Sequence, residues 1–131
     1  MKLNYEAEKY SEWTKAGLTT FDRKLEYETA FDGVIKIYSL KTNNPNLNSQ
    51  LDGKYFADFI HYAENGVFLR MFKDKKSWPK TRLIYIDFRS YKLTTIKKTN
   101  SSYTFWKSTD LGNGKHLFEI KPTEKIEFEI K

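Results

Sequence analysis

The sequence predicts a mainly β protein, an antiparallel meander of about eight or nine strands curled into a barrel or a sandwich, with one short N-terminal helix. Three observations predict it. Apolar and polar residues alternate with a period of two over much of the chain after residue 20. Short turn signals separate these segments. With 131 residues, of which 17% are aromatic, the chain is long enough for one domain, and we interpret residues 1–131 as a single β-rich domain.

The first segment has the features of a helix over residues 5–16. Asn4 is a suitable cap, Lys15 suits the negative end of the helix dipole, and Gly17 can terminate the helix. Tyr10 and Trp13 are three residues apart and would share one face. We therefore expect this helix to lie over one side or one end of a sheet.

Two hairpins follow. Residues 20–32 and 34–40 alternate in polarity around Asp32-Gly33, a two-residue turn signal, and residues 42–53 are polar enough to predict a loop. The second hairpin pairs residues 55–64 with 67–73 across Asn65-Gly66.

In the register that sets Glu64 opposite Val67, both faces of this second hairpin carry apolar residues, which requires cover on both sides. A helix over 54–63 also fits the apolar spacing, but Asn65-Gly66 favours a strand.

The rest of the chain predicts five more strands. The turns between them fall at Arg89-Ser90, at 99–101, at 111–114 and at Pro122-Thr123. The expected strands are Leu83–Phe88, Tyr91–Lys98, Ser102–Lys107, His116–Lys121 and Lys125–Ile130. The last strand alternates Ile126, Phe128 and Ile130, and as an exposed edge it is a place where two copies could pair into a homo-oligomer.

Several kinds of chemistry have no support in the sequence. The chain has no cysteine and two histidines, and it carries neither a zinc-protease motif nor a calcium loop, so we expect no metal site. No glycine-rich phosphate or dinucleotide motif is present, and we expect no cofactor. The N-terminus lacks the apolar run of a signal peptide and no stretch is long enough to span a bilayer, which predicts a cytoplasmic protein.

Positive charge is concentrated in the middle of the chain. The net charge is +6, and residues 70–98 hold ten Lys or Arg but only Asp74 and Asp87 as acids. A basic region in an otherwise balanced chain indicates an anionic partner, although a solvated lysine-rich surface gives the same pattern.

From this region we predict a non-enzymatic binding protein that engages an acidic macromolecule, with an acidic protein as the first choice of partner. An inhibitor, an immunity-type protein and a phage or host accessory factor are the kinds of protein that fit. Trp78, in a proline-containing loop, is the expected aromatic anchor unless its ring packs back onto the core. The predicted binding residues are Arg70, Lys73, Lys75, Lys76, Trp78, Lys80, Arg82, Lys97 and Lys98.

Three alternatives remain. A nucleic-acid-binding protein would use the same cations, with Trp78, Tyr103 and Trp106 as stacking platforms. A small barrel could enclose an apolar ligand. A metal-free ribonuclease would use His61 and His116 as base and acid, with an arginine, either Arg70 or Arg82, on the phosphate. Against this last alternative, the alternation of His116 with Phe118 and Ile120 places it toward the core, and His61 is expected as a surface or cross-strand neighbour of Arg70.

Overall fold

The computed structural model describes residues 10–28 and 35–130, which form ten strands in two antiparallel sheets and one short helix. The elements are β1 (Ser11–Ala16), β2 (Thr19–Glu28), β3 (Lys36–Thr42), α2 (Pro45–Leu51), β4 (Phe56–Ala63), β5 (Gly66–Phe72), β6 (Lys80–Asp87), β7 (Lys92–Asn100), β8 (Lys107–Gly112), β9 (Lys115–Lys121) and β10 (Glu124–Glu129).

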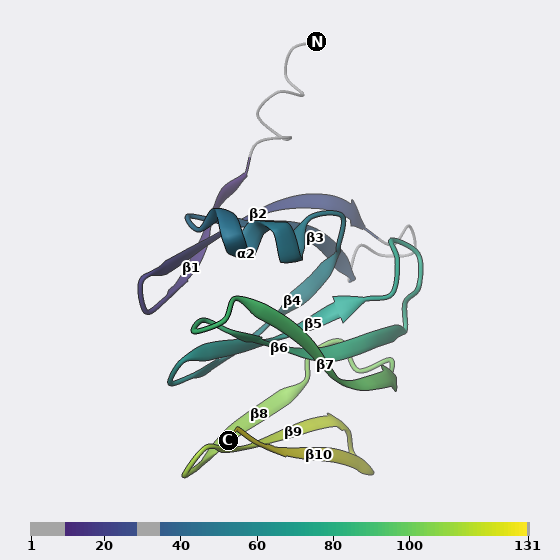
Figure 1. Cartoon of the computed structure of the whole chain (residues 1–131). Helices are drawn as coiled ribbons and strands as arrows, with labels where there is room; N and C mark the ends of the chain where they lie inside the picture. The colour runs from purple at the N-terminus through teal and green to yellow at the C-terminus, as the bar shows by residue number, and fades with distance from the viewer. Residues whose placement is uncertain (1–9, 29–34, 131) are drawn as a thin grey trace.

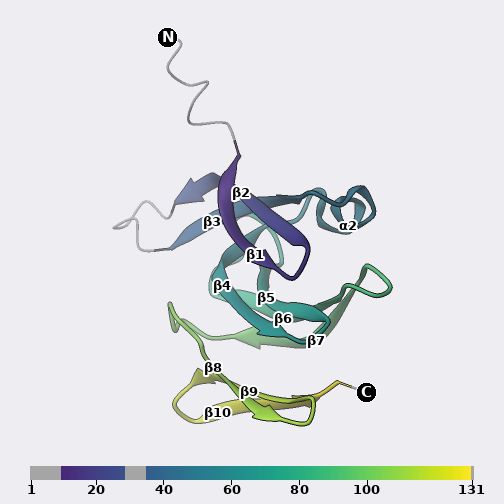
Figure 2. The same cartoon turned by 90° about the vertical axis from the view of Figure 1, so that its left-hand side faces the viewer.

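The strands form three layers, which Figures 1 and 2 show from two directions. Seven strands form one sheet in the order β1 to β7, and this sheet curls so that β1–β3 lie over β4–β7. The smaller sheet, in the order β10-β9-β8, lies on the other side of β4–β7. Because β1 and β7 do not pair with each other, the large sheet is open. The predicted antiparallel meander is confirmed, and its form is closer to a sandwich than to a closed barrel.

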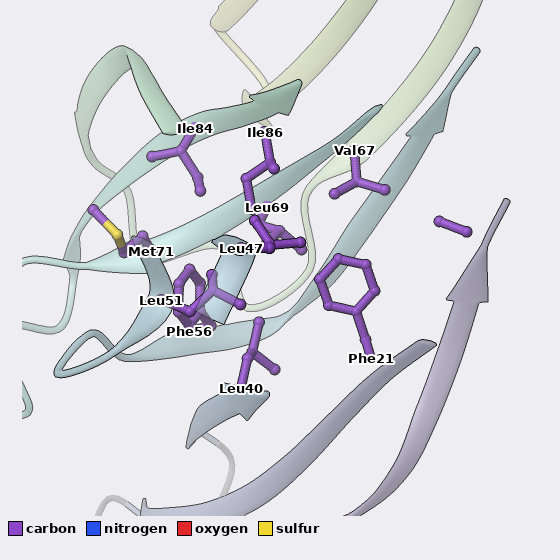
Figure 3. Packing of buried hydrophobic residues seen from close by; sticks show 11 residues of the cluster. Phe21, Leu40, Leu47, Leu51, Phe56, Val67, Leu69, Met71, Ile84 and Ile86 are labelled. Atoms are coloured by element: carbon purple, nitrogen blue, oxygen red, sulfur yellow. The ribbon is translucent and has the colours of Figure 1, made fainter. Parts of the chain in front are cut away.

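The inside of the curled sheet is filled by apolar side chains and by α2 (Figure 3). The loop predicted over 42–53 is therefore wrong, because residues 45–51 form this helix. Asn44 caps it by accepting from the backbone N–H groups of Asn46 and Leu47, and Pro45 occupies its first turn. Leu47 and Leu51, four residues apart, are fully buried in the core, so a mostly polar segment is held as a helix by two leucines.

The central hairpin β4–β5 confirms the expectation of cover on both faces. All seven residues of β5 are buried. Val67, Leu69 and Met71 pack toward α2 and β1–β3, while Phe68 packs toward the small sheet. Such a strand is apolar on both faces because it is the middle layer of three.

The register and turn of this hairpin differ from the prediction by two residues. Ala63 pairs with Gly66, and the turn is Glu64-Asn65 rather than Asn65-Gly66. A shift of two keeps each side chain on the predicted face. Gly66 lies in the strand because a Cβ atom there would stand 2.2 Å from the carbonyl oxygen of Ile86. The glycine serves a close approach to β6, not the turn.

Two further predictions are wrong. Residues 11–16 are a strand paired with β2, so the N-terminal helix is absent there, and residues 5–9 lie outside the described residues. Strand pairing outweighs the helix signals because it buries Ala16 and packs Trp13 against the core. Residues 102–106 are not a strand, and β8 begins only at Lys107.

The remaining predicted strands are present, but β6 begins three residues earlier than expected, and β7 extends through Asn100, so residues 99–100 are strand rather than turn. β2 and β3 form the first hairpin, although its expected Asp32-Gly33 turn lies outside the described residues. Turns are present at Arg89-Ser90 and Pro122-Thr123. β10 is an edge strand, as expected, but Ile126 is buried and Phe128 and Ile130 pack against the core of the small sheet.

Candidate anion-binding site

Four of the predicted cations gather at the ends of β5, β6 and β7. A hollow of about 300 Å³ lies there. Its lining residues are Lys73, Lys80, Thr81, Arg82, Lys98, Thr99 and Asn100. No acidic side chain is among them. The residues that line this hollow are therefore either cations or uncharged polar residues.

Strand alternation explains how the cations come together. Lys80 and Arg82 are two residues apart on β6 and share a face, and Lys98 and Asn100 do the same on β7. The register sets Arg82 opposite Lys98 and Lys80 opposite Asn100. Lys73 follows directly after β5. It is two residues beyond Met71, which is opposite Arg82 on β6.

The described residues provide no ion pair that neutralises the charges of this hollow. Like charges directly opposite each other on neighbouring strands are unfavourable. Among the described residues, none of Lys73, Lys80, Arg82 or Lys98 has an ion pair, whereas Arg23, Lys24, Arg89 and Lys121 each have one. An anionic group in the hollow would relieve this repulsion.

The other predicted lysines do not join the hollow. Lys97 is adjacent to Lys98 and opposite Leu83, so its side chain projects to the other face of β7. The ammonium of Lys75 lies 5.4 Å from the ring centre of Tyr55. Lys76 is exposed in the loop between β5 and β6. The cations of the basic region therefore do not all lie on one surface, and only some of them line the hollow.

Arg70 does not belong to the surface at all, and its prediction as a binding residue is corrected. Its side chain is 0% exposed and projects to the face opposite Met71. The guanidinium donates from Nε to Thr81 Oγ1 at 3.0 Å and from Nη2 to the carbonyl oxygen of Ser101 at 3.0 Å. Its Nη1 donates to the carbonyl oxygens of Tyr103 at 2.7 Å and Thr104 at 3.3 Å.

Two tryptophan rings enclose the same guanidinium. Its Cζ atom lies 4.8 Å from the ring centre of Trp78 and 4.2 Å from that of Trp106. Burial lowers the pKa of Arg70 to about 9, so the side chain still carries its charge at neutral pH. Arg70 connects the central sheet to residues 101–104, and its use of their carbonyl groups explains why this segment is not a strand.

Trp78 is consequently a packing residue. Its half-buried ring lies against Arg70 and, at 6.3 Å between ring centres, against Phe72. These residues occupy the face opposite the basic hollow, so the expected aromatic anchor and the cations are separated by the sheet. Trp106 is buried too, which removes it as a stacking platform, while Tyr103 is 38% exposed.

The two histidines, far apart in sequence, are in direct contact. His61 Nε2 lies 2.9 Å from His116 Nδ1, and His61 Nδ1 lies 2.9 Å from Ser108 Oγ. Burial, followed by the nearby His116, lowers the pKa of His61, while Asp110 acts in the opposite direction. The expectation that His116 faces the core is confirmed, since it is 3% exposed.

This arrangement does not favour the ribonuclease hypothesis. His61 pairs with Phe68 across the strands rather than with Arg70. Neither arginine considered for holding a phosphate is available beside the pair, because Arg70 is enclosed by tryptophans and Arg82 lines the basic hollow. Both nitrogens of His61 are also engaged within the chain.

Within residues 10–28 and 35–130, no group of three or more His, Asp or Glu side chains is placed to hold a metal ion. No helix in the same ranges is long and apolar enough to cross a membrane. No protein-family model, curated protein sequence or solved structure matches this chain.

Sequence reasoning found four cations of the hollow and missed its polar lining residues, Thr81, Thr99 and Asn100. Alternation along β7 and the correct register could have found Asn100, which is opposite Lys80, whereas Thr81 and Thr99 turn their hydroxyl groups to the face of Arg70 and had no such signal. The burial of Arg70 had a signal as well, since it lies within Val-Phe-Leu-Arg-Met-Phe, a segment that is otherwise wholly apolar.

Proposed function

We propose that this chain is a non-enzymatic binding protein that engages an acidic protein through the hollow formed by Lys73, Lys80, Arg82 and Lys98. The observation that carries the proposal is the convergence of four cations, without an acidic lining residue, around a hollow of about 300 Å³. A space of this size accommodates a few carboxylate side chains of a partner. Arg82 can bind a carboxylate with two parallel hydrogen bonds, and the lysines supply further positive charge.

An acidic protein is favoured over a nucleic acid by the nature of the lining. Binding of single-stranded nucleic acid relies on aromatic rings that stack on bases, in addition to cations that track the phosphates. The hollow contains threonine and asparagine but no aromatic side chain. Trp78 and Trp106, the rings expected to stack, hold Arg70 on the other face.

The test compares two charge reversals on neighbouring residues. Lys98→Glu changes the hollow, and Lys97→Glu introduces the same charge one residue away on the opposite face. We measure binding of a fluorescent oligoglutamate peptide and of a single-stranded oligonucleotide of equal charge by anisotropy at several salt concentrations. Lys98→Glu is expected to weaken peptide binding at least tenfold, while Lys97→Glu weakens it less than threefold.

The outcomes separate the candidate partners. Tighter binding of the peptide, lost in Lys98→Glu, supports the proposal. Tighter binding of the oligonucleotide, with a steep log-linear dependence on salt, would replace the protein partner by a nucleic acid. Equal effects of the two substitutions would show that only the overall charge matters and would refute a site at the hollow.

Narrower hypotheses depend on the partner itself. We keep as predictions a role as an inhibitor, immunity-type or accessory protein, a cytoplasmic location, and pairing of two copies through β10. A pull-down from native lysate with and without nuclease addresses the role. The apolar-ligand alternative is not favoured, because Leu47 and Leu51 of α2 fill the inside of the curled sheet.

A further inference from the structure

A second hollow, of about 340 Å³, lies at the junction of the two sheets and has the opposite electrostatic character. The turn between β4 and β5, the turn between β8 and β9, the start of the β6–β7 turn and the end of β10 form its walls. Its polar side chains include Glu64, Tyr85, Arg89, Asp110 and His116. This volume is at the lower end of the range of small-molecule sites, about 300–1,000 Å³.

Tyr85 supplies the observation that points to a ligand. Its side chain is 6% exposed and its hydroxyl is buried, yet no described residue forms a hydrogen bond with that hydroxyl. Buried hydroxyl groups in proteins are normally hydrogen-bonded, since leaving one unpaired is costly. Burial raises the pKa of Tyr85, so the hydroxyl keeps its proton and can both donate and accept.

The position of this hydroxyl depends on Gly66. A Cβ atom at Gly66 would lie 2.6 Å from Tyr85 Oη and 2.8 Å from Tyr85 Cε1. The absence of a side chain at this position lets the tyrosine ring lie over the first residue of β5. The ring therefore ends beside the Glu64-Asn65 turn, whose two residues both line the hollow.

The charges around the hollow favour a cationic ligand over an anionic one. Arg89 donates to both carboxylate oxygens of Asp87, from Nε at 3.1 Å and from Nη2 at 3.0 Å, so its charge is already paired. Glu64 and Asp110 contribute two carboxylates, neither of which has an ion pair within 4.0 Å among the described residues. A phosphate or carboxylate would meet repulsion here, while an ammonium group would be attracted.

His116 adds a hydrogen-bonding group. Whether its Nε2 donates or accepts depends on the direction of the hydrogen bond between its Nδ1 and His61. Its Nδ1 is engaged by His61, and no described residue bonds its Nε2. If His116 Nδ1–H donates to His61, then His61 Nδ1–H donates to Ser108 and His116 Nε2 becomes an acceptor. In this tautomer His116 suits a ligand that donates hydrogen bonds, as an amine does.

We propose that the hollow at the sheet junction binds a small organic amine that carries, besides its ammonium group, a second polar atom for the Tyr85 hydroxyl. Glu64 and Asp110 attract the ammonium, and His116 Nε2 accepts a hydrogen bond from the same ligand. The site is separate from the basic hollow, so it neither requires nor excludes the acidic partner proposed above.

The test uses four compounds with the same four-carbon chain: 4-amino-1-butanol, 1,4-diaminobutane, 1,4-butanediol and succinate. Binding is followed by NMR chemical shifts of the amides of residues 110–116 and of the His116 ring. We expect saturable shifts with both amines, binding of the diol at least tenfold weaker, and no saturable shift with succinate. Equal binding of the diol or of succinate would overturn the proposal, as would the absence of saturation with both amines.

Variants with matched controls distinguish a ligand contact from a purely structural role. Tyr85→Phe removes only the hydroxyl and is expected to weaken 4-amino-1-butanol binding by about three- to tenfold. Tyr103→Phe removes a hydroxyl outside the hollow and should leave it unchanged.

The same comparison applies to the carboxylates. Glu64→Gln should weaken binding of both amines, whereas Glu127→Gln on the exposed face of β10 should not. Unchanged amine affinity in both Tyr85→Phe and Glu64→Gln would refute the site. Lys98→Glu should leave amine binding intact, so failure here is distinguishable from failure of the proposed function.

Discussion

The two faces of the β5–β6 pair hold arginines in contrasting surroundings. On one face, the guanidinium of Arg70 is fully buried, donates hydrogen bonds to three backbone carbonyls and lies between two tryptophan rings. On the other face, Arg82 lines an open hollow and is set opposite Lys98. The chain supplies a hydrogen-bond acceptor to every nitrogen of the first guanidinium and surrounds the second with more positive charge.

This difference separates a structural cation from a candidate binding cation. A buried charge is tolerated only where the protein replaces the hydrogen bonds that water would make. Arg70 meets this condition at each of its three nitrogens, and because it is 0% exposed it is not accessible to a partner. Arg82 is short of negative charge, and an anionic partner is the most direct way to supply it. The comparison predicts a large loss of stability when Arg70 is substituted and almost none when the same substitution is made at Arg82.

The largest expected effect is that of Arg70→Met. The substitution keeps an apolar stem but leaves the carbonyl groups of Ser101, Tyr103 and Thr104 without their donor, so we expect a loss of about 3–5 kcal/mol in the free energy of unfolding. Urea unfolding followed by tryptophan fluorescence measures it, because Trp78 and Trp106 lie against the guanidinium.

Arg82→Met is the matched control, with the same substitution on the paired strand. It removes a cation from a repulsive group, and we expect a change within about 1 kcal/mol of zero. If the two variants lost the same stability, the distinction between the two faces would be wrong.

Sequence reasoning found the meander because alternation and turn residues are local signals that survive folding. It found the cations of the basic hollow because they lie in the stretch of concentrated positive charge at residues 70–98, and the register of β6 and β7 then brings Lys80, Arg82 and Lys98 to one face. It misplaced Arg70 because an arginine in an apolar strand becomes acceptable only through acceptors 31 to 34 residues later in the chain, which no local pattern shows.

The errors at α2 and β1 have the same origin. The segment Pro45–Leu51 is too polar to predict a helix alone, and it is stabilised by two leucines in a core built from distant strands. Residues 11–16 have helix-compatible ends, yet pairing with β2 determines their structure. The contact between His61 and His116 could not be predicted either, because it depends on how the small sheet lies on the large one.

A smaller effect is expected for His61, which lies on the same face as Arg70 and is also satisfied within the chain. Its folded pKa lies below the ordinary value of 6.5, so the unfolded chain binds the proton more readily. Stability should therefore fall as the pH drops from about 7.5 through 6.5. Asp110 opposes this change, and carboxylates such as Glu26 and Asp87 titrate only at lower pH.

His61→Gln keeps a hydrogen-bonding side chain and removes the titration. We expect a cost of about 1–2 kcal/mol at pH 7.5 from poorer hydrogen bonds to Ser108 and His116. We also expect a smaller fall in stability between pH 7.5 and pH 5.5 than in the unchanged protein. Urea unfolding at both pH values measures the two effects, and an unchanged pH dependence would remove His61 as its source.

The smallest expected effect concerns Lys98 and has the opposite sign. Lys98→Gln removes one of two like charges that face each other, and relief of that repulsion should raise the free energy of unfolding by about 0.2–1 kcal/mol at low salt. The gain should shrink in 1 M NaCl, where charges only a few ångström apart are already screened. Lys97→Gln, opposite the apolar Leu83, should show neither the gain nor its salt dependence.

This last comparison links stability to binding at one residue. A substitution at Lys98 that stabilises the free protein and also weakens binding of an acidic peptide would mean that the native lysine opposes folding and favours a partner. Residues that lower the stability of the free protein and strengthen binding are typical of binding sites. The like charges that attract a charged partner repel each other while the partner is absent. If Lys98→Gln instead lowered stability, Lys98 would be making a favourable contact within the chain, and the hollow would be a solvated surface rather than a site.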